Sequence, residues 1–126
     1  MLYEKSSTKT MEEIGSALRE SAAAHKFGVL HVHDLQQKMR EKGVEMERQV
    51  CVFEVCNPAQ AKIVVEANPA ISNALPCRIA VYEKDGRLVV STMLPTMLIG
   101  MFGTEELQPV AAEVEAVLKA MVDAAA

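Results

Sequence analysis

Residues 77–94 of the chain, CRIAVYEKDGRLVVSTML, carry the pattern that decides the fold. Two runs of alternating residues, rich in β-branched side chains, flank the dipeptide Asp85-Gly86. Asp-Gly suits the two central positions of a tight turn, because both residues tolerate positive φ angles. The stretch therefore predicts a β-hairpin, in which two antiparallel strands are joined by a two-residue loop.

The register of this hairpin places apolar side chains on both faces of the sheet. With the turn at Asp85-Gly86, Val81 lies opposite Val90, and Tyr82 lies opposite Val89. Because neighbouring residues of a strand point to opposite faces, the two pairs lie on different sides. One face can accept the helices of the fold. The apolar residues on the other face must also be shielded from water, and a second subunit is the simplest way to shield them.

The segments around the hairpin show strand or helix periodicity. Thr10 and Glu13 have the spacing of a capping box, and apolar residues then recur at helical intervals. Asn57 followed by Pro58 is a typical helix start. The predicted strands outside the hairpin are residues 1–6, 29–34 and 47–55. The predicted helices are residues 10–25, 35–43, 58–67, 95–102 and about 104–122, where Pro109 can delay the regular part of the last helix.

These segments predict a single-domain α+β fold over residues 1–126. Their order is strand, helix, strand, short helix, strand, helix, hairpin, short helix and long helix. This order favours one antiparallel-rich sheet with the main helices packed on one face. A chain of 126 residues can bury a hydrophobic core without help from disulfides or a structural metal.

Charge and composition argue against several classes of function. The net charge is −4 and the basic residues are scattered, which argues against nucleic-acid binding. No apolar run approaches the roughly 20 residues that cross a bilayer. The N-terminal MLYEKSSTKT (residues 1–10) lacks the apolar core of a secretory signal, so we expect a cytoplasmic protein. There the three cysteines are expected to be free thiols, ligands or redox groups.

Four stretches form a specific combination. They are FGVLHVHDLQQKMREKGV (residues 27–44), VFEVCNPAQA (52–61), ALPCRIAVYEKDG (74–86) and the Pro-Thr segment at 95–96. Together they resemble the domain of unknown function 302 family, from about Tyr3 to the last helix. The resemblance implies an α+β fold with the outline of TATA-box-binding-protein-like folds, and a homodimer. It supplies no catalytic residue, because no activity is established across the family.

Two cysteines lie at the ends of predicted elements. Cys56 directly precedes a predicted helix, where the helix dipole and free amides can lower a thiol pKa. Cys77 opens the first hairpin strand. If one end of the sheet brings them together, they could form a redox pair, bind a soft ion or pass on a sulfur atom. The alternative is packing. Cys51 is an odd number of residues from Cys56, so we expect it on the other face, as packing.

Two histidines on a predicted strand form the main polar cluster. His31 and His33 are two residues apart and therefore share a face. This spacing suits metal ligation, with His33 as the candidate ligand and Asp34 able to orient an imidazole. The alternative is a polar strand end with two solvated histidines. His25 lies late in the first helix, where a cation is favourable, and needs no other role.

The short apolar helix predicted at residues 95–102 carries Met97 and Met101 on one face. Such a segment is buried, covers a pocket or forms a subunit contact. With a histidine nearby, an apolar pocket would suit haem, for which histidine and methionine are both axial ligands. The candidate cofactor-binding residues are therefore His31, His33, Met97 and Met101. Packing at a dimer contact is the alternative for this helix.

Two functions of different classes fit these patterns. The first is a non-catalytic homodimer that binds an apolar or haem-like ligand near the subunit contact. The second is a cytoplasmic thiol-redox or sulfur-carrier protein that uses Cys56 with Cys77. Acid–base enzymes normally show several polar groups that converge on one pocket, and no such set is evident in the sequence. Binding is therefore favoured over catalysis.

Overall fold

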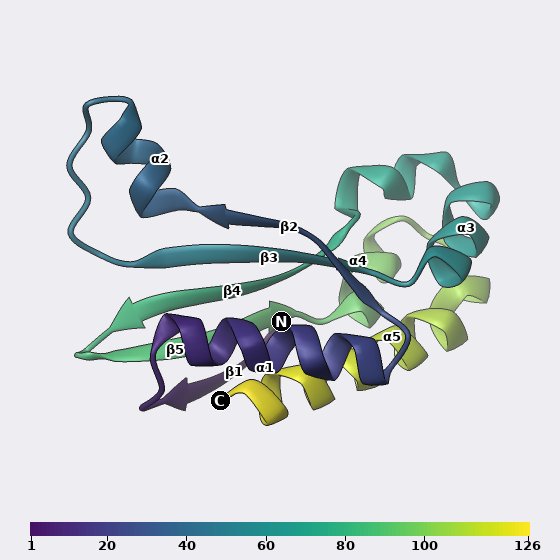
Figure 1. The fold of residues 1–126 in the computed structure, drawn as a ribbon. Helices are drawn as coiled ribbons and strands as arrows, with labels where there is room; N and C mark the ends of the chain where they lie inside the picture. Colours follow the sequence, from purple (N-terminus) through teal and green to yellow (C-terminus); the bar gives the residue numbers. More distant parts are fainter.

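A single antiparallel sheet forms the centre of the computed structural model, which describes residues 1–126 (Figure 1). The strand order is β1-β5-β4-β3-β2, and every neighbouring pair is antiparallel. The strands are β1 (Leu2–Ser7), β2 (Gly28–Asp34), β3 (Val50–Cys56), β4 (Cys77–Lys84) and β5 (Arg87–Met93). The predicted α+β class and the predicted order of elements are confirmed.

The predicted hairpin is formed by β4 and β5, in the interior of the sheet. Val81 pairs with Val90 and Tyr82 pairs with Val89, as the register predicts. At the turn, Asp85 has φ of 53° and Gly86 has φ of 79°. Positive φ at both central residues gives the loop a twist that matches the twist of the strands it joins.

Five α-helices and two short 3₁₀ helices complete the chain. They are α1 (Met11–Ala24), α2 (Leu35–Glu41), α3 (Pro58–Ala67), η1 (Pro69–Ala74), α4 (Pro95–Met101), η2 (Glu105–Leu107) and α5 (Gln108–Ala125). Both hydrogen bonds of the predicted capping box link Thr10 to Glu13. The last helix begins at Gln108, later than its predicted start near Thr104, because the preceding turn is the separate helix η2. None of these helices is long and apolar enough to span a membrane.

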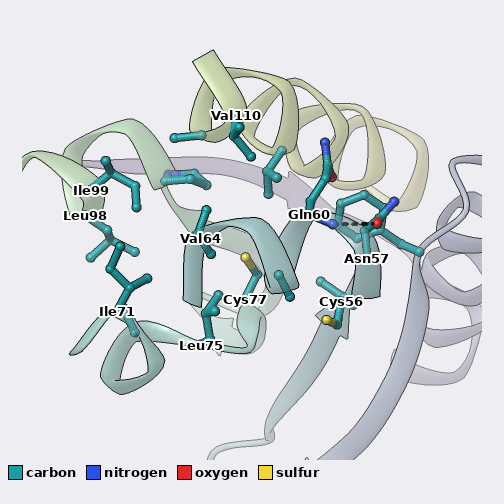
Figure 2. A pocket seen from close by; sticks show the side chains of 17 residues that line it. Cys56, Asn57, Gln60, Val64, Ile71, Leu75, Cys77, Leu98, Ile99 and Val110 are labelled. Carbon is teal, nitrogen blue, oxygen red and sulfur yellow. Dashed lines mark hydrogen bonds between the residues drawn. The ribbon is translucent and has the colours of Figure 1, made fainter. Parts of the chain in front are cut away.

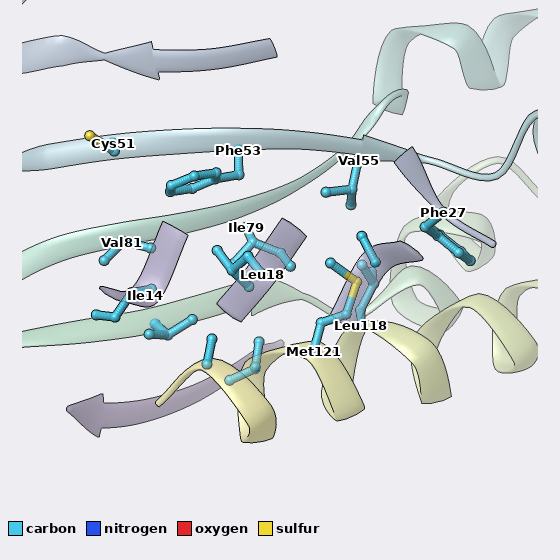
Figure 3. Close-up of a cluster of buried hydrophobic side chains, with 14 of the residues drawn as sticks. Ile14, Leu18, Phe27, Cys51, Phe53, Val55, Ile79, Val81, Leu118 and Met121 are labelled. Carbon is cyan, nitrogen blue, oxygen red and sulfur yellow. The ribbon is translucent and has the colours of Figure 1, made fainter. Parts of the chain in front are cut away.

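The main hydrophobic core lies between the sheet and the pair α1 and α5, which run side by side on one face (Figure 1). Side chains from both helices meet alternate residues of β3, β4 and β5 in this layer (Figure 3). The buried residues are Ile14, Leu18, Ala22, Phe27, Cys51, Phe53, Val55, Ile79, Val81, Leu88, Val90, Leu118, Met121, Val122 and Ala125. This layer accounts for the apolar stripes of the first and last helices.

A second, smaller cluster is formed by α3, η1, α4, η2 and the first turns of α5. These elements gather at one end of the sheet (Figure 1). The buried members are Val64, Ile71, Ile99, Leu107 and Ala111. The two clusters share α5, whose N-terminal part contributes to the small cluster and whose C-terminal part contributes to the main core.

The face of the sheet away from α1 and α5 is partly covered by its own side chains. Tyr82 on β4 donates a hydrogen bond from its hydroxyl to Glu4 on β1, so its side chain crosses the intervening strand β5. Beneath that crossing, Val89 is 8% exposed and Ser91 is 3% exposed. Apolar residues therefore occupy this face too, as the hairpin register predicts.

Candidate functional site

An apolar hollow lies where α3, η1, α4 and α5 meet the end of the sheet (Figure 2). We call it the apolar pocket. Its volume is about 60 Å³, and 14 of its 17 lining residues are hydrophobic. The lining residues are Phe27, Val55, Cys56, Asn57, Gln60, Ala61, Val64, Ile71, Ala74, Leu75, Cys77, Pro95, Leu98, Ile99, Val110, Ala111 and Val114. No charged side chain belongs to this set.

Local signals in the sequence place α3 against the end of the sheet. The Asn57 side chain, directly after Cys56, accepts a hydrogen bond of 3.1 Å from the backbone amide of Gln60. Pro58 takes the first helical position, where its missing N–H costs no hydrogen bond. Asn68 then caps η1 in a similar way. Asn57-Pro58 therefore caps and starts α3, and Asn68-Pro69 caps and starts η1 in the same way.

Cys56 and Cys77 both line the apolar pocket and are both free thiols. Cys77 pairs with Val55, the neighbour of Cys56, so the two cysteines lie at the same end of the sheet. In Figure 2 the sulfur of Cys77 points into the ring of apolar side chains, whereas that of Cys56 lies at its edge. The sheet therefore brings the two thiols to one hollow without joining them.

Burial favours the neutral form of both thiols. Loss of hydration raises the pKa of Cys77 to about 11; the neighbouring Cys56 adds to this shift, and Arg78 opposes it. Burial also raises the pKa of Cys56. A helix start can lower a thiol pKa, but the direction found for Cys56 is upward, because burial disfavours the thiolate.

Cys51 lies apart from the other two cysteines, in the main core. It is 7% exposed and packs with the residues that face α1 and α5. Burial, and to a smaller extent the nearby Asp34, raise the pKa of the Cys51 thiol. The predicted role of Cys51 in packing, on the other face from Cys56, is confirmed.

Gln60 is a polar lining residue that the sequence did not single out. Its Nε2 donates a hydrogen bond of 3.1 Å to Glu113 on α5. Its Oε1 is buried and has no hydrogen-bond partner. A buried acceptor without a partner costs about 1–3 kcal/mol, so a donor on a bound molecule would be favourable there. The sequence held one indication that Gln60 lies near Cys56: it stands in the first turn of the helix that Asn57 caps.

The histidine pair lies outside the apolar pocket, on the sheet face away from α1 and α5. Beyond a bulge between Val29 and His31, His31 pairs with Glu54 and His33 pairs with Val52. The two rings share a face as predicted, with their centroids 6.0 Å apart. No group of three or more His, Cys, Asp or Glu residues is arranged to hold a metal ion.

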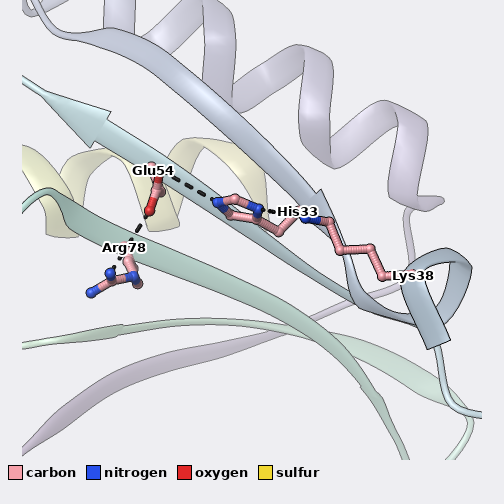
Figure 4. A network of polar contacts seen from close by, with 4 residues as sticks. All are labelled: His33, Lys38, Glu54 and Arg78. Atoms are coloured by element: carbon pink, nitrogen blue, oxygen red, sulfur yellow. Dashed lines mark hydrogen bonds and ion pairs between the residues drawn. The ribbon is translucent and has the colours of Figure 1, made fainter. Parts of the chain in front are cut away.

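His33 belongs to a line of polar contacts across three strands (Figure 4). Its Nε2 lies 3.4 Å from Oε1 of Glu54, and its Nδ1 lies 3.4 Å from Nζ of Lys38. The other carboxylate oxygen of Glu54 lies 3.7 Å from the Arg78 guanidinium. Both ring nitrogens of His33 therefore have partners within the chain. This arrangement ties β2 to β3 and β4.

Met97 and Met101 also lie outside the apolar pocket. Met97 is 46% exposed and Met101 is 74% exposed. Other residues of α4, Leu98 and Ile99, belong to the pocket lining. The predicted helix is thus a wall of the pocket, but neither of its methionines lines the pocket. The four candidate cofactor-binding residues do not gather around one hollow.

A second hollow, the side groove, lies beside the pocket at the ends of β4 and β5. Its volume is about 320 Å³. It is lined by Asn73, Ala74, Pro76, Cys77, Arg78, Thr92, Met93, Pro95, Leu98, Met101, Phe102 and Leu118. The residues that line both hollows are Ala74, Cys77, Pro95 and Leu98. The two hollows are therefore neighbours on either side of a thin wall.

A family model and a solved structure are similar to the chain over nearly its full length. The model described as domain of unknown function DUF302 matches residues 3–125. The crystal structure of an uncharacterized conserved DUF302 protein from Bacillus stearothermophilus is 33% identical, with a TM-score of 0.92, over 99% of this chain and 98% of the other. No curated protein matches the chain. Sequence and fold thus agree that the chain belongs to the DUF302 family.

Proposed function

We propose that the protein is a non-catalytic binding protein that holds a small apolar ligand in the apolar pocket. The observation that carries the proposal is the lining, which is hydrophobic at 14 of 17 positions and has no charged residue. Ligand sites in proteins are mostly apolar, with a few polar groups that orient the ligand. Here Asn57, Gln60 and the two thiols supply those groups.

The pocket favours a ligand smaller than haem. Its volume is about 60 Å³, whereas sites for drug-sized ligands measure about 300–1,000 Å³. Its lining contains neither histidine nor methionine, so it offers none of the predicted axial ligands. The ligand that fits this pocket is a small apolar molecule, or the apolar end of a longer one.

We expect Ala111→Val to weaken the binding of 1-decanol by about tenfold. Ala111 lines the pocket and is 3% exposed, so two added carbons occupy space that the ligand would fill. Displacing about two buried methylene groups of the ligand costs about 1.6 kcal/mol, which corresponds to about tenfold in affinity. Isothermal titration calorimetry measures both dissociation constants.

Ala112→Val is the matched control, because it makes the same change at an exposed position one residue further along α5. We expect this variant to bind 1-decanol as the unmodified protein does. An equal loss in both variants would assign the effect to the helix rather than to the pocket. Absence of any binding to the unmodified protein would contradict the proposed function itself.

A second candidate function is thiol chemistry, favoured by the meeting of Cys56 and Cys77 at one pocket. The raised pKa of each thiol weighs against it, since the thiolate is the reactive form. Alkylation of the protein at pH 7, followed by mass spectrometry, separates the two functions. Faster alkylation of Cys56 than of a model thiol would favour a redox or sulfur-carrier role.

We further propose that the protein is cytoplasmic. The three free cysteines support this location, because thiols stay reduced in the cytoplasm.

We also propose that two copies of the chain associate through the sheet face that α1 and α5 leave uncovered. The half-buried residues Val52, Ala80 and Tyr82 lie on this face, and a second copy would complete their burial. Static light scattering at micromolar concentration is then expected to give twice the chain mass of 13.7 kDa. A mass equal to that of one chain would contradict the dimer.

A further inference from the structure

The side groove and the apolar pocket share four lining residues, of which Pro95 is buried and rigid and the other three are small or can change rotamer. Ala74 and Cys77 are small, and Leu98 lies on the short helix α4. A rotamer change at Leu98 is the kind of side-chain motion that surface helices make on a short timescale. The side groove, at about 320 Å³, lies at the lower end of the usual range for small-molecule sites, about 300–1,000 Å³, and the apolar pocket adds about 60 Å³.

Arg78 is the only charged residue in the lining of either hollow. Arg78 lies near the start of β4, at the end of the sheet face that we propose as the dimer contact, and its side chain is 52% exposed in the single chain. Its polar contact within the chain is the ion pair with Glu54 at 3.7 Å. That distance joins one guanidinium nitrogen to one carboxylate oxygen, which leaves other N–H donors of the fork unused. A planar guanidinium at the edge of an apolar groove is suited to a carboxylate.

We propose that the ligand is a monocarboxylic acid with an unbranched apolar chain, such as a medium-chain fatty acid. Its carboxylate binds Arg78, and its chain follows the side groove past Cys77 and Leu98 into the apolar pocket. This inference rests on the proposed function and adds the chemical class of the ligand. Met93 and Met101 line the groove, and methionine adapts its shape to flexible apolar chains.

Calorimetric titration with decanoate and with 1-decanol tests the role of the carboxylate, because the two ligands share one chain length. For the unmodified protein we expect decanoate to bind at least about tenfold more tightly than 1-decanol, as a charge-assisted contact requires. In Arg78→Gln the preference for decanoate should disappear, while the affinity for 1-decanol stays unchanged. Arg78→Lys should keep part of the preference, because lysine retains the charge without the fork.

Arg87→Gln is the matched control, since Arg87 is an exposed arginine at the turn end of β5 and lines neither hollow. It should leave the preference for decanoate unchanged. An equal loss in Arg78→Gln and Arg87→Gln would overturn the inference, because it would show an effect of net charge alone. Equal affinities of the unmodified protein for both ligands would overturn the carboxylate site and leave the proposed function standing.

Passage of the chain into the apolar pocket is tested with Ala111→Val. If the decanoate chain reaches the pocket, this variant weakens decanoate binding by about tenfold, as it does for 1-decanol. Unchanged decanoate affinity in Ala111→Val, with weakened 1-decanol binding, would overturn the joined path while leaving the pocket as the site of neutral ligands. Failure of the unmodified protein to bind either ligand would contradict both the inference and the proposed function.

Discussion

Leu18→Ala is expected to lower the free energy of unfolding by about 3 kcal/mol, within the range of about 2–5 kcal/mol for buried leucines. Leu18 on α1 is 0% exposed, in the layer between the sheet and α5. The substitution removes apolar contacts and leaves a hole that the surrounding strands and helices fill only in part. A loss of this size is a large share of the stability of a domain of this length.

Urea denaturation followed by circular dichroism measures this effect. Leu30→Ala is the matched control, because Leu30 on β2 is 52% exposed and its truncation should cost less than about 1 kcal/mol. All proteins should be compared at one concentration, because any association of copies would make the apparent stability depend on it. Similar losses for Leu18→Ala and Leu30→Ala would contradict the placement of the main core.

The second large effect is a pH-dependent loss of stability that depends on Cys77. Its thiol has a pKa of about 11 in the folded protein and 9.0 as the reference value. Between those values the unfolded chain releases the thiol proton and the folded chain keeps it, so unfolding becomes easier as the pH rises. The expected loss between pH 9 and pH 11 is about 2 kcal/mol.

Cys77→Val isolates this effect, because valine is apolar, of similar size and does not titrate. The fall in unfolding free energy between pH 9 and pH 11 should be about 2 kcal/mol smaller in Cys77→Val than in the unmodified protein. Tyr3 and Tyr82 also have a raised pKa, but they are present in both proteins and cancel in the difference. Identical pH profiles for the two proteins would show that the Cys77 thiol is not held neutral by burial.

Most of the fold could be predicted from short-range signals. Asp85-Gly86 defined the hairpin and its register, because a two-residue turn leaves one way to pair the strands. The Thr10 cap and the Asn57-Pro58 start located α1 and α3 to within a residue. The predicted start of α5 was less accurate, because residues 105–107 form a separate 3₁₀ helix. Acidic residues favour the first turn of either kind of helix, so Glu105 and Glu106 do not show which kind forms.

The candidate site was only partly predictable, because it depends on how elements pack. Alternation along β2 showed that His31 and His33 share a face, but not that α1 and α5 cover the other one. Helical spacing likewise grouped Met97 with Met101, yet the side of α4 that packs inward carries Ile99. The pocket draws residues from five segments, so no single stretch of sequence could reveal it.

The cysteine within VFEVCNP (residues 52–58), Cys56, shows the same limit. The helix start was correct, and the strand ends at Cys56, one residue beyond its predicted end. The pKa of Cys56 was predicted from the helix start alone, whereas the structure adds the apolar walls of the pocket, and burial raises the pKa. The pocket that Cys56 lines is assembled from segments far apart in the sequence, which no local signal describes.

Isoleucine methyl NMR spectra recorded during titration with 1-decanol test the apolar pocket most directly. The chain has five isoleucines. Ile71 and Ile99 line the pocket, Ile14 and Ile79 lie in the main core, and Ile63 is 50% exposed. Binding in the pocket predicts saturable shifts of the Ile71 and Ile99 methyl signals, with Ile14 and Ile79 unchanged. Shifts confined to Ile63, or no shifts at saturating ligand, would contradict the proposed function.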